Sequence, residues 1–240
     1  MKHKLLPRLL DYIYPPSCHL CEVGTSGGRY LCSDCFENSA RIVAPLCSRC
    51  GEAFEGKLNE PVLCPNCHNL RFHFDFARAA LKNTNSNHQI VVDFKYLKQF
   101  HLATELANFC AETMRNDARF AELPTPVLIP IPLHWKRYWK RGFNQSEELA
   151  KAISSVTKIP THNSLRRIRN TKTQTRLARK ERLSNLKGAF VLRKIPQHFR
   201  SAILVDDVFT TGSTADACAA ELKKHAPQLE NIVVLTALRG

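Results

Sequence analysis

Apolar residues follow different patterns on the two sides of residue 72. Beyond it, short continuous apolar runs alternate with stretches in which apolar residues recur every three or four positions. Continuous runs are typical of strands buried on both faces of a parallel sheet, and the longer spacing is that of an amphipathic helix. The pattern predicts strands at 77–81, 127–132, 201–205 and 232–238, and helices at 88–98, 102–115, 146–156 and 214–225.

This alternation predicts an α/β fold, with a parallel sheet and helices on both faces. Residues before 72 are instead rich in proline and glycine turns and predict no long helix. We therefore expect a cysteine-rich region at 1–72 and an α/β domain at 73–240. Within the second region, residues 170–186 are polar and cationic, which predicts a mobile loop.

Eight of the ten cysteines form four Cys-x-x-Cys pairs before residue 72. Two such pairs complete a tetrahedral sulfur site that suits structural zinc. Gaps of 10 and 13 residues favour sequential pairing into two sites, with interleaved pairing as the alternative. His19 and His68 are possible substitute ligands, and Cys110 and Cys218 are predicted to be core residues. The predicted ligand sets are Cys18, Cys21, Cys32 and Cys35, and Cys47, Cys50, Cys64 and Cys67.

The net charge of +14 is concentrated in one stretch. Residues 134–200 hold 18 Lys and Arg against three Asp and Glu, which favours a phosphate-bearing partner over a merely solvated cationic surface. No run of 18 apolar residues occurs, so no membrane insertion is expected. Arg8 and Asp11 interrupt what would be the apolar part of a signal peptide, so we expect a cytoplasmic location.

Residues 203–214 carry the most specific chemistry. An apolar strand leads to Asp206 and Asp207, and a hydroxyl-rich turn around Gly212 then opens a helix. Helix-start amides and hydroxyls bind phosphate, whereas carboxylates accept hydrogen bonds from sugar hydroxyls. The segment therefore predicts a phosphorylated-sugar site, the alternative being a turn capped by Asp207 before an ordinary helix start. The predicted phosphate ligands are Thr210, Thr211, Gly212, Ser213 and Thr214.

This segment resembles the phosphoribosyl-pyrophosphate (PRPP) motif of type I phosphoribosyltransferases. Together with the cysteine pairs, nearly the whole chain resembles the competence protein F (ComF) family. The resemblance also rests on residues 94–96, 129–133 and 141–145, and on Gln174, Arg179, Arg182 and Asn185. It implies a double zinc ribbon region, then a type I phosphoribosyltransferase-like domain, and a role in DNA uptake and handling during natural transformation.

The resemblance also implies roles for single residues. Asp206 and Asp207 would bind the ribose hydroxyls, and Arg179 and Arg182 would be candidate catalytic residues of a lid loop, whose alternative is a solvated loop. Activity, if present, would be PRPP-dependent pentosyl transfer to an unidentified acceptor; ligand binding without turnover is the alternative. Pyrophosphate, with Mg²⁺, would lie against Lys95, Arg141, Gly142, Asn144 and Gln145.

Aromatic and cationic residues alternate within residues 134–141. Single-strand binders use this combination to stack bases and neutralise the phosphate backbone. The segment therefore predicts a contact with single-stranded DNA, and DNA-processing proteins are further possible partners. Under the alternative interpretation, Trp135, Tyr138 and Trp139 pack against the edge of the sheet.

Overall fold

The computed structural model describes residues 17–56, 60, 62–169, 186 and 188–240. The predicted lid residues Arg179 and Arg182 lie outside the described residues. The helices are α2 (Ser33–Glu37), α3 (Pro65–His68), α4 (Asn85–Tyr96), α5 (Leu102–Asn116), η2 (Ala118–Phe120), α6 (Trp135–Arg141), α7 (Gln145–Thr157) and α9 (Ser213–His225). The strands are β1 (Ala77–Leu81), β2 (Pro126–Pro130), β3 (Leu165–Arg167), β4 (Phe190–Leu192), β5 (Ser201–Phe209) and β6 (Asn231–Arg239).

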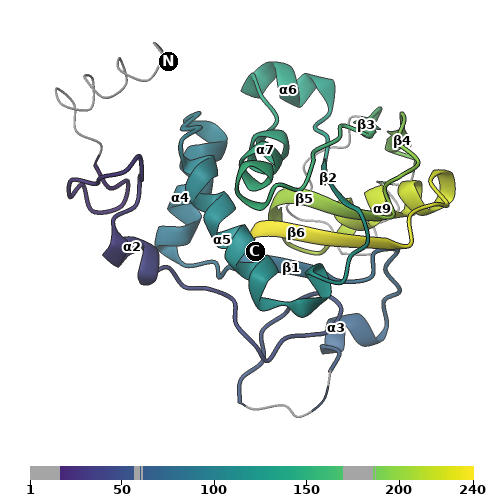
Figure 1. The fold of residues 1–240 in the computed structure, drawn as a ribbon, viewed down its shortest axis with the longest axis horizontal. Helices are drawn as coiled ribbons and strands as arrows, with labels where there is room; N and C mark the ends of the chain where they lie inside the picture. Colours follow the sequence, from purple (N-terminus) through teal and green to yellow (C-terminus); the bar gives the residue numbers. More distant parts are fainter. Residues whose placement is uncertain (1–16, 57–59, 61, 170–185, 187) are drawn as a thin grey trace.

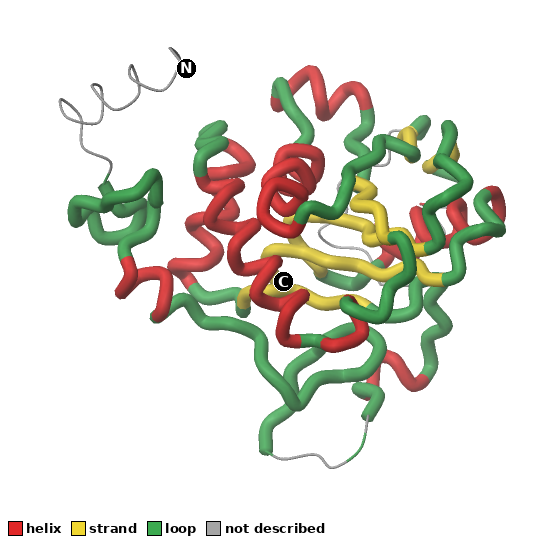
Figure 2. The backbone as a smooth tube through the Cα atoms, viewed as in Figure 1, coloured by secondary structure: helices red, strands yellow, loops and turns green. Residues whose placement is uncertain are grey.

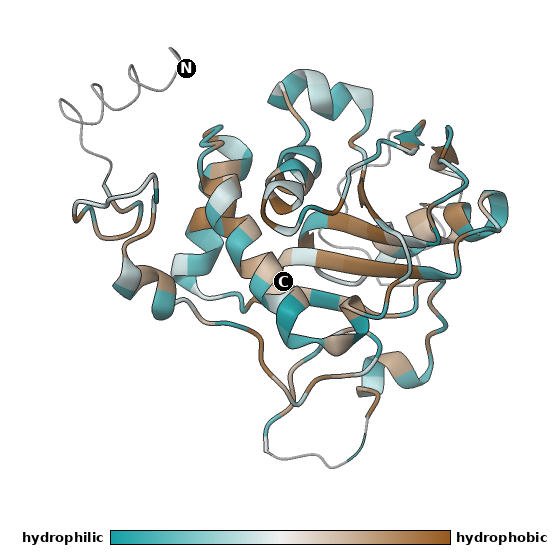
Figure 3. Ribbon diagram, in the orientation of Figure 1, coloured by the Kyte–Doolittle hydropathy of each residue, from teal (hydrophilic) through white to brown (hydrophobic). Residues whose placement is uncertain are grey.

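Four strands form a parallel sheet in the order β1-β6-β5-β2 (Figures 1 and 2). The two central strands, β5 and β6, are nine residues long and mostly hydrophobic, as their brown colour in Figure 3 shows. Their apolar side chains are almost entirely buried. Continuous burial explains why these strands appear in the sequence as uninterrupted apolar runs.

Helices cover both faces of the sheet, so the predicted α/β fold class is confirmed. Helices α4, α5 and α7 pack on one face around residues such as Ile203 and Val205. Helix α9 packs on the other face, where Ala202 and Leu204 point. The second half of the cysteine-rich region belongs to this second core, because Cys47 and Phe72 are buried in it.

Both edges of the sheet are covered by irregular chain. On the outer side of β1, the amide of Ile42 donates to Ala80 O at 2.9 Å and the amide of Ala77 donates to Arg49 O at 2.7 Å. On the outer side of β2, the amide of Leu128 donates to Pro160 O at 2.9 Å. The linker between the two groups of cysteines is therefore an integral part of the sheet architecture.

The structure departs from the sequence prediction at three places. Strand β5 continues to Phe209, four residues past the predicted end, because it still pairs with β6 after its pairing with β2 stops at Val205. Helix α6 was not predicted. The short antiparallel pair β3 and β4, which flanks the undescribed residues 170–185, was not predicted either.

Candidate functional site

The acidic pair, Asp206 and Asp207, lies on the part of β5 that extends beyond β2. The two carboxylates contact different helices, both of which pack on the same face of the sheet. Ser146 Oγ, in the first turn of α7, donates to Asp206 Oδ1 at 2.8 Å. Lys95, near the end of α4, forms a close ion pair with Asp207. Two helices of one face are thus tied to the end of the central strand.

The two acids have opposite electrostatic character. Burial, reinforced by the negative charge of Asp207, raises the pKa of Asp206 to about 7. Burial would also raise the pKa of Asp207, but the Lys95 ammonium outweighs it and holds the pKa of that carboxyl below its usual value. Asp207 is therefore an ionised partner of Lys95, whereas Asp206 changes its charge close to neutral pH.

The hydroxyl-rich turn, residues 210–214, adjoins Asp206. Gly212 adopts a left-handed φ of 75° at the N-cap position of α9, where it has no side chain to cap the helix amides. Thr211 Oγ1 lies 2.8 Å from Ser213 Oγ. A small cavity of about 30 Å³ is lined by the turn together with Asp206 and Thr236. One acid and the start of a helix therefore border the same space at the carboxyl end of the sheet, where α/β proteins bind ligands.

Residues 141–145 form the link from α6 to α7 beside this site. Gly142 ends α6 with a φ of 84°, and Arg141 Nη1 donates to Gln145 Oε1 at 2.5 Å. Asn144 caps α7 and also donates to Ile131 O at 3.2 Å. Asn144 and Gln145 are buried, whereas the Arg141 guanidinium lies 5.2 Å from the ring centre of Tyr96, at the surface. Of these predicted pyrophosphate ligands, Arg141 and Gly142 are the accessible ones.

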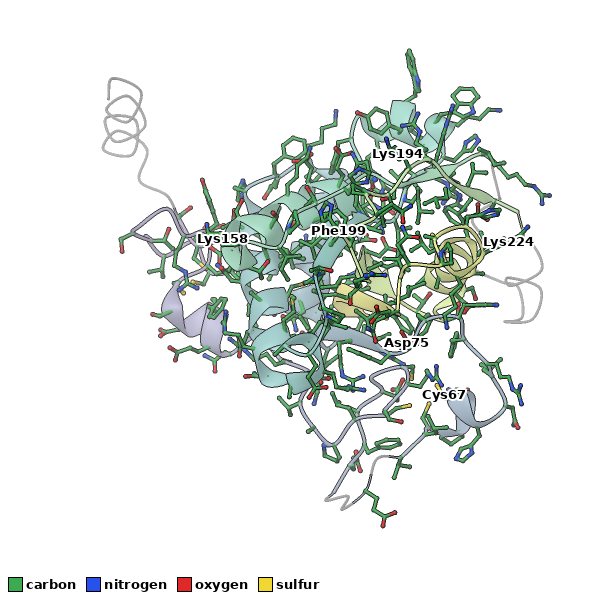
Figure 4. The ribbon with its side chains drawn as sticks, turned by 45° about the vertical axis from the view of Figure 1, so that its right-hand side comes forward. Cys67, Asp75, Lys158, Lys194, Phe199 and Lys224 are labelled. Carbon is green, nitrogen blue, oxygen red and sulfur yellow. The ribbon has the colours of Figure 1, made fainter. Side chains whose placement is uncertain are left out.

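The eight paired cysteines gather in two clusters, in the sequential pairing. The first cluster is Cys18, Cys21, Cys32 and Cys35, and the second is Cys47, Cys50, Cys64 and Cys67. Cys67 of the second cluster is labelled in Figure 4. Sulfur atoms of Cys21 and Cys32, and of Cys50 and Cys64, lie 3.6 Å apart. A tetrahedron with Zn–S bonds of about 2.3 Å has S–S edges of about 3.8 Å, so both clusters fit structural zinc.

The two clusters differ in exposure and in their contacts. All four cysteines of the second cluster are buried, whereas Cys21 of the first cluster is exposed. The first cluster packs on α4 and α5: His19 Nε2 lies 2.8 Å from Asp93 Oδ2, so His19 faces a carboxylate rather than the other ligands. Cys110 and Cys218 are buried in the α/β core, as predicted, and burial raises the pKa of the Cys110 thiol to about 12.

Helix α6 carries its aromatic residues outward. The exposed fractions are 55% for Trp135, 47% for Tyr138 and 81% for Trp139. The interpretation that these rings pack against the sheet edge is therefore wrong. Residues three and four apart share one face of a helix, so the three rings form one exposed strip, with Lys136 and Lys140 beside it.

A cavity of about 490 Å³ lies away from the acidic pair, between residues 41–46 and α5. Its charged side chains are paired with one another: Arg41 Nε donates to Glu112 at 2.9 Å and Arg78 Nε to Asp117 at 2.8 Å. This pairing satisfies the charges of the cavity wall, so the cavity is a weaker ligand site than the hydroxyl-rich turn.

We expect Asp206→Asn to stabilise the protein at about pH 8 by about 2 kcal/mol, and much less at about pH 5. Because the pKa of Asp206 is higher in the folded than in the unfolded protein, the free energy of unfolding falls as pH rises from about 4 to about 7. Asparagine cannot ionise, so it avoids this loss, and its side-chain oxygen still accepts the hydrogen bond from Ser146. Thermal unfolding at both pH values measures the effect. The exposed Glu230→Gln is the control. An equal shift at both pH values would contradict the assignment.

Mild thiol oxidation should release zinc in two phases, with the first cluster losing its ion before the second. An exposed thiolate such as that of Cys21 reacts faster than the buried thiolates of the second cluster. A chromogenic zinc chelator follows the release, and Cys21→Ser should remove the fast phase. Simultaneous loss of both ions would show that burial does not separate the clusters.

Comparison with known proteins agrees with the cysteine-rich part of this architecture. Residues 9–68 match the family described as the double zinc ribbon domain. The DNA utilization protein YhgH of Escherichia coli K12 is 28% identical over 214 residues, 88% of this chain and 92% of that protein. The adenine phosphoribosyltransferase of Leishmania donovani is a distant structural neighbour, with a TM-score of 0.30 and 15% identity over 62% of this chain and 68% of that chain.

Competence protein F of Haemophilus influenzae is 32% identical to this chain over 198 residues. The match covers 81% of this chain and 84% of that protein. No helix among the described residues has the length and apolarity needed to cross a bilayer. The extent and identity of this match show that the chain belongs to the competence protein F family.

Proposed function

We propose that the chain binds PRPP, or a related phosphoribosyl ligand, where β5 meets α9, and that this binding supports the handling of incoming DNA. One observation carries the ligand assignment: Asp206 and the glycine-capped start of α9 line the same cavity at the carboxyl end of the sheet. The amides and hydroxyls of residues 210–214 would hold the 5-phosphate, and Asp206 would accept from the ribose hydroxyls.

The cations of the site suit the pyrophosphate end of the ligand. Lys95 is already at Asp207, and the positive charge of Arg141 also acts on that carboxyl. When PRPP enters as its Mg²⁺ complex, these two side chains would face the pyrophosphate, since guanidinium and ammonium groups bind phosphate oxygens strongly. Asp207 would then hold Lys95 in position and take the second ribose contact.

The same site is compatible with transfer as well as binding. In that reaction the bond from ribose C1 to pyrophosphate breaks, the acceptor supplies the electron pair of the new bond to C1, and pyrophosphate leaves with Mg²⁺. Positive charge from Arg141 and Lys95 would stabilise the leaving group. Binding is the primary proposal, because the described residues supply ligands for PRPP and none that identifies an acceptor.

A second activity is binding of single-stranded DNA by α6. Trp135 and Trp139 are exposed one helical turn apart with cations beside them, a spacing that lets bases stack while phosphates are neutralised. The relatives named as a competence protein and a DNA utilization protein support a partner of this kind. The exposed ring of Tyr96 lies 5.2 Å from the guanidinium of Arg141, the last residue of α6.

At about pH 8, where Asp206 is ionised, Asp206→Asn should weaken PRPP binding at least about ten-fold, because a hydrogen bond to a charged group contributes about 1.5–3 kcal/mol. Calorimetric titration with Mg²⁺ measures the loss. Asp206 is chosen over Asp207 because replacing Asp207 would leave the half-buried Lys95 ammonium without its partner. Glu148→Gln, which removes the same charge from the first turn of α7, is the matched control. Unchanged affinity of the Asp206 variant would refute the sugar site.

Replacing both Trp135 and Trp139 by alanine should weaken binding of a single-stranded oligonucleotide by one to two orders of magnitude, since each stacked base contributes about 1–3 kcal/mol. Fluorescence anisotropy at several salt concentrations measures this. Neutralising Lys136, Arg137 and Lys140 should instead reduce the salt dependence. Binding that is insensitive both to salt and to loss of the two rings would exclude α6 as the DNA contact.

A further inference from the structure

The second cysteine cluster is packed directly behind the hydroxyl-rich turn. Phe72 and Phe74, a few residues after Cys67, stack with ring centres 4.5 Å apart, and Phe74 meets the ring of Phe209 edge-on at 6.2 Å. Phe209 is the last residue of β5, and its ring lies so close to Gly212 that a Cβ there would be 2.7 Å from its Cζ. The aromatic residues after the cluster thus form the wall against which the turn folds.

Arg239, near the end of β6, connects this wall to the cysteines. Its guanidinium lies 5.0 Å from the ring centre of Phe209. The same group donates to the carbonyl of Cys50, forms an ion pair with Glu52, and places Nη2 3.4 Å from Cys50 Sγ. One side chain therefore contacts a cluster sulfur and the ring that supports Gly212.

A second connection joins the same region to the first turn of α9. The amide of His73 donates to Asp216 Oδ1 at 2.5 Å, and His73 Nδ1 lies 3.2 Å from both carboxylate oxygens. Asp216 is four residues beyond Gly212, on the helix whose start forms the predicted phosphate contact. The turn is therefore held on both sides by the chain that leaves the second cluster.

The position of the Arg239 guanidinium should depend on whether the second cluster holds zinc, because the zinc-loaded cluster carries negative charge. Four thiolates around one Zn²⁺ leave a net charge of about −2, which a neighbouring guanidinium compensates. The first cluster is held differently: the described contacts tie it to α4 and α5, through His19 with Asp93 and through the Tyr30 amide with Glu105. This difference gives an internal control.

We propose that Arg239 is a positioning residue that couples the second zinc ribbon to the hydroxyl-rich turn, so that this ribbon is part of the ligand site. With the ribbon intact, Arg239 holds Phe209 against Gly212 and keeps the left-handed turn in the shape that presents the helix amides. Without an intact ribbon, Arg239 no longer holds Phe209 in place and the turn loses its support. The effect on ligand affinity rests on the proposed function, whereas the coupling itself does not.

Arg239→Gln tests the coupling in the ligand-free protein. The chain has nine glycines, so selective ¹⁵N-glycine labelling gives a simple amide spectrum in which Gly212 can be assigned. We expect the Gly212 resonance to shift or broaden in Arg239→Gln, with Arg239→Lys intermediate because it keeps the charge but loses the planar contact with Phe209. Gly142, at the end of α6, should be unaffected. An unchanged Gly212 resonance would overturn the inference.

Calorimetry with PRPP then tests the consequence for the site. Arg239→Gln should lower affinity about ten-fold, the size of effect typical of residues that orient a ligand-contacting group. Cys64→Ser should do the same, whereas Cys21→Ser should leave affinity unchanged although each removes one zinc ligand. Equal losses from both cysteine variants would overturn the specific link. A wild-type protein that binds no PRPP would refute the proposed function, while the Gly212 spectrum would still decide the coupling.

Discussion

The ion pair between Lys95 and Asp207 joins helix α4 to the end of the central strand, and the candidate site is arranged around it. Burying two charges is costly unless each has its partner, so this pair fixes where α4 ends relative to β5. It also assigns different roles to adjacent acids. Asp207 stays ionised against Lys95, and the charge on Asp207 helps to keep Asp206 protonated up to about pH 7. The electrostatics of the pocket follow from this one contact.

The sheet could be predicted from the sequence because its strands are buried on both faces. Strand β1 has the predicted bounds, and the main helices differ from prediction by at most a few residues. The predicted end of β5 was wrong because the apolar run stops at the two aspartates. The strand continues past them because it still pairs with β6. Helix α6 was missed because it is only seven residues long and buries no side chain. Strands β3 and β4 were missed because they are three residues each.

The site was predictable to the extent that it is local in sequence. The turn 210–214 follows from its own residue types, and the pairing of the cysteines follows from their spacing. The partnership of Lys95 with Asp207 joins positions more than a hundred residues apart, and the contact of Arg239 with Cys50 spans 189 residues. Such contacts depend on how the layers pack, which local patterns do not encode. The implied roles of Arg179 and Arg182 stay predictions.

The chain segment that borders β1 has a consequence for how the protein can be divided. Residues 40–49 satisfy main-chain groups along the outer side of that strand, as the Ile42–Ala80 and Ala77–Arg49 hydrogen bonds show. An α/β half separated from its cysteine-rich half would expose amides and carbonyls along a flat, apolar border strand. Such a border recruits strands from other molecules, so the separated half would tend to self-associate rather than stay monomeric.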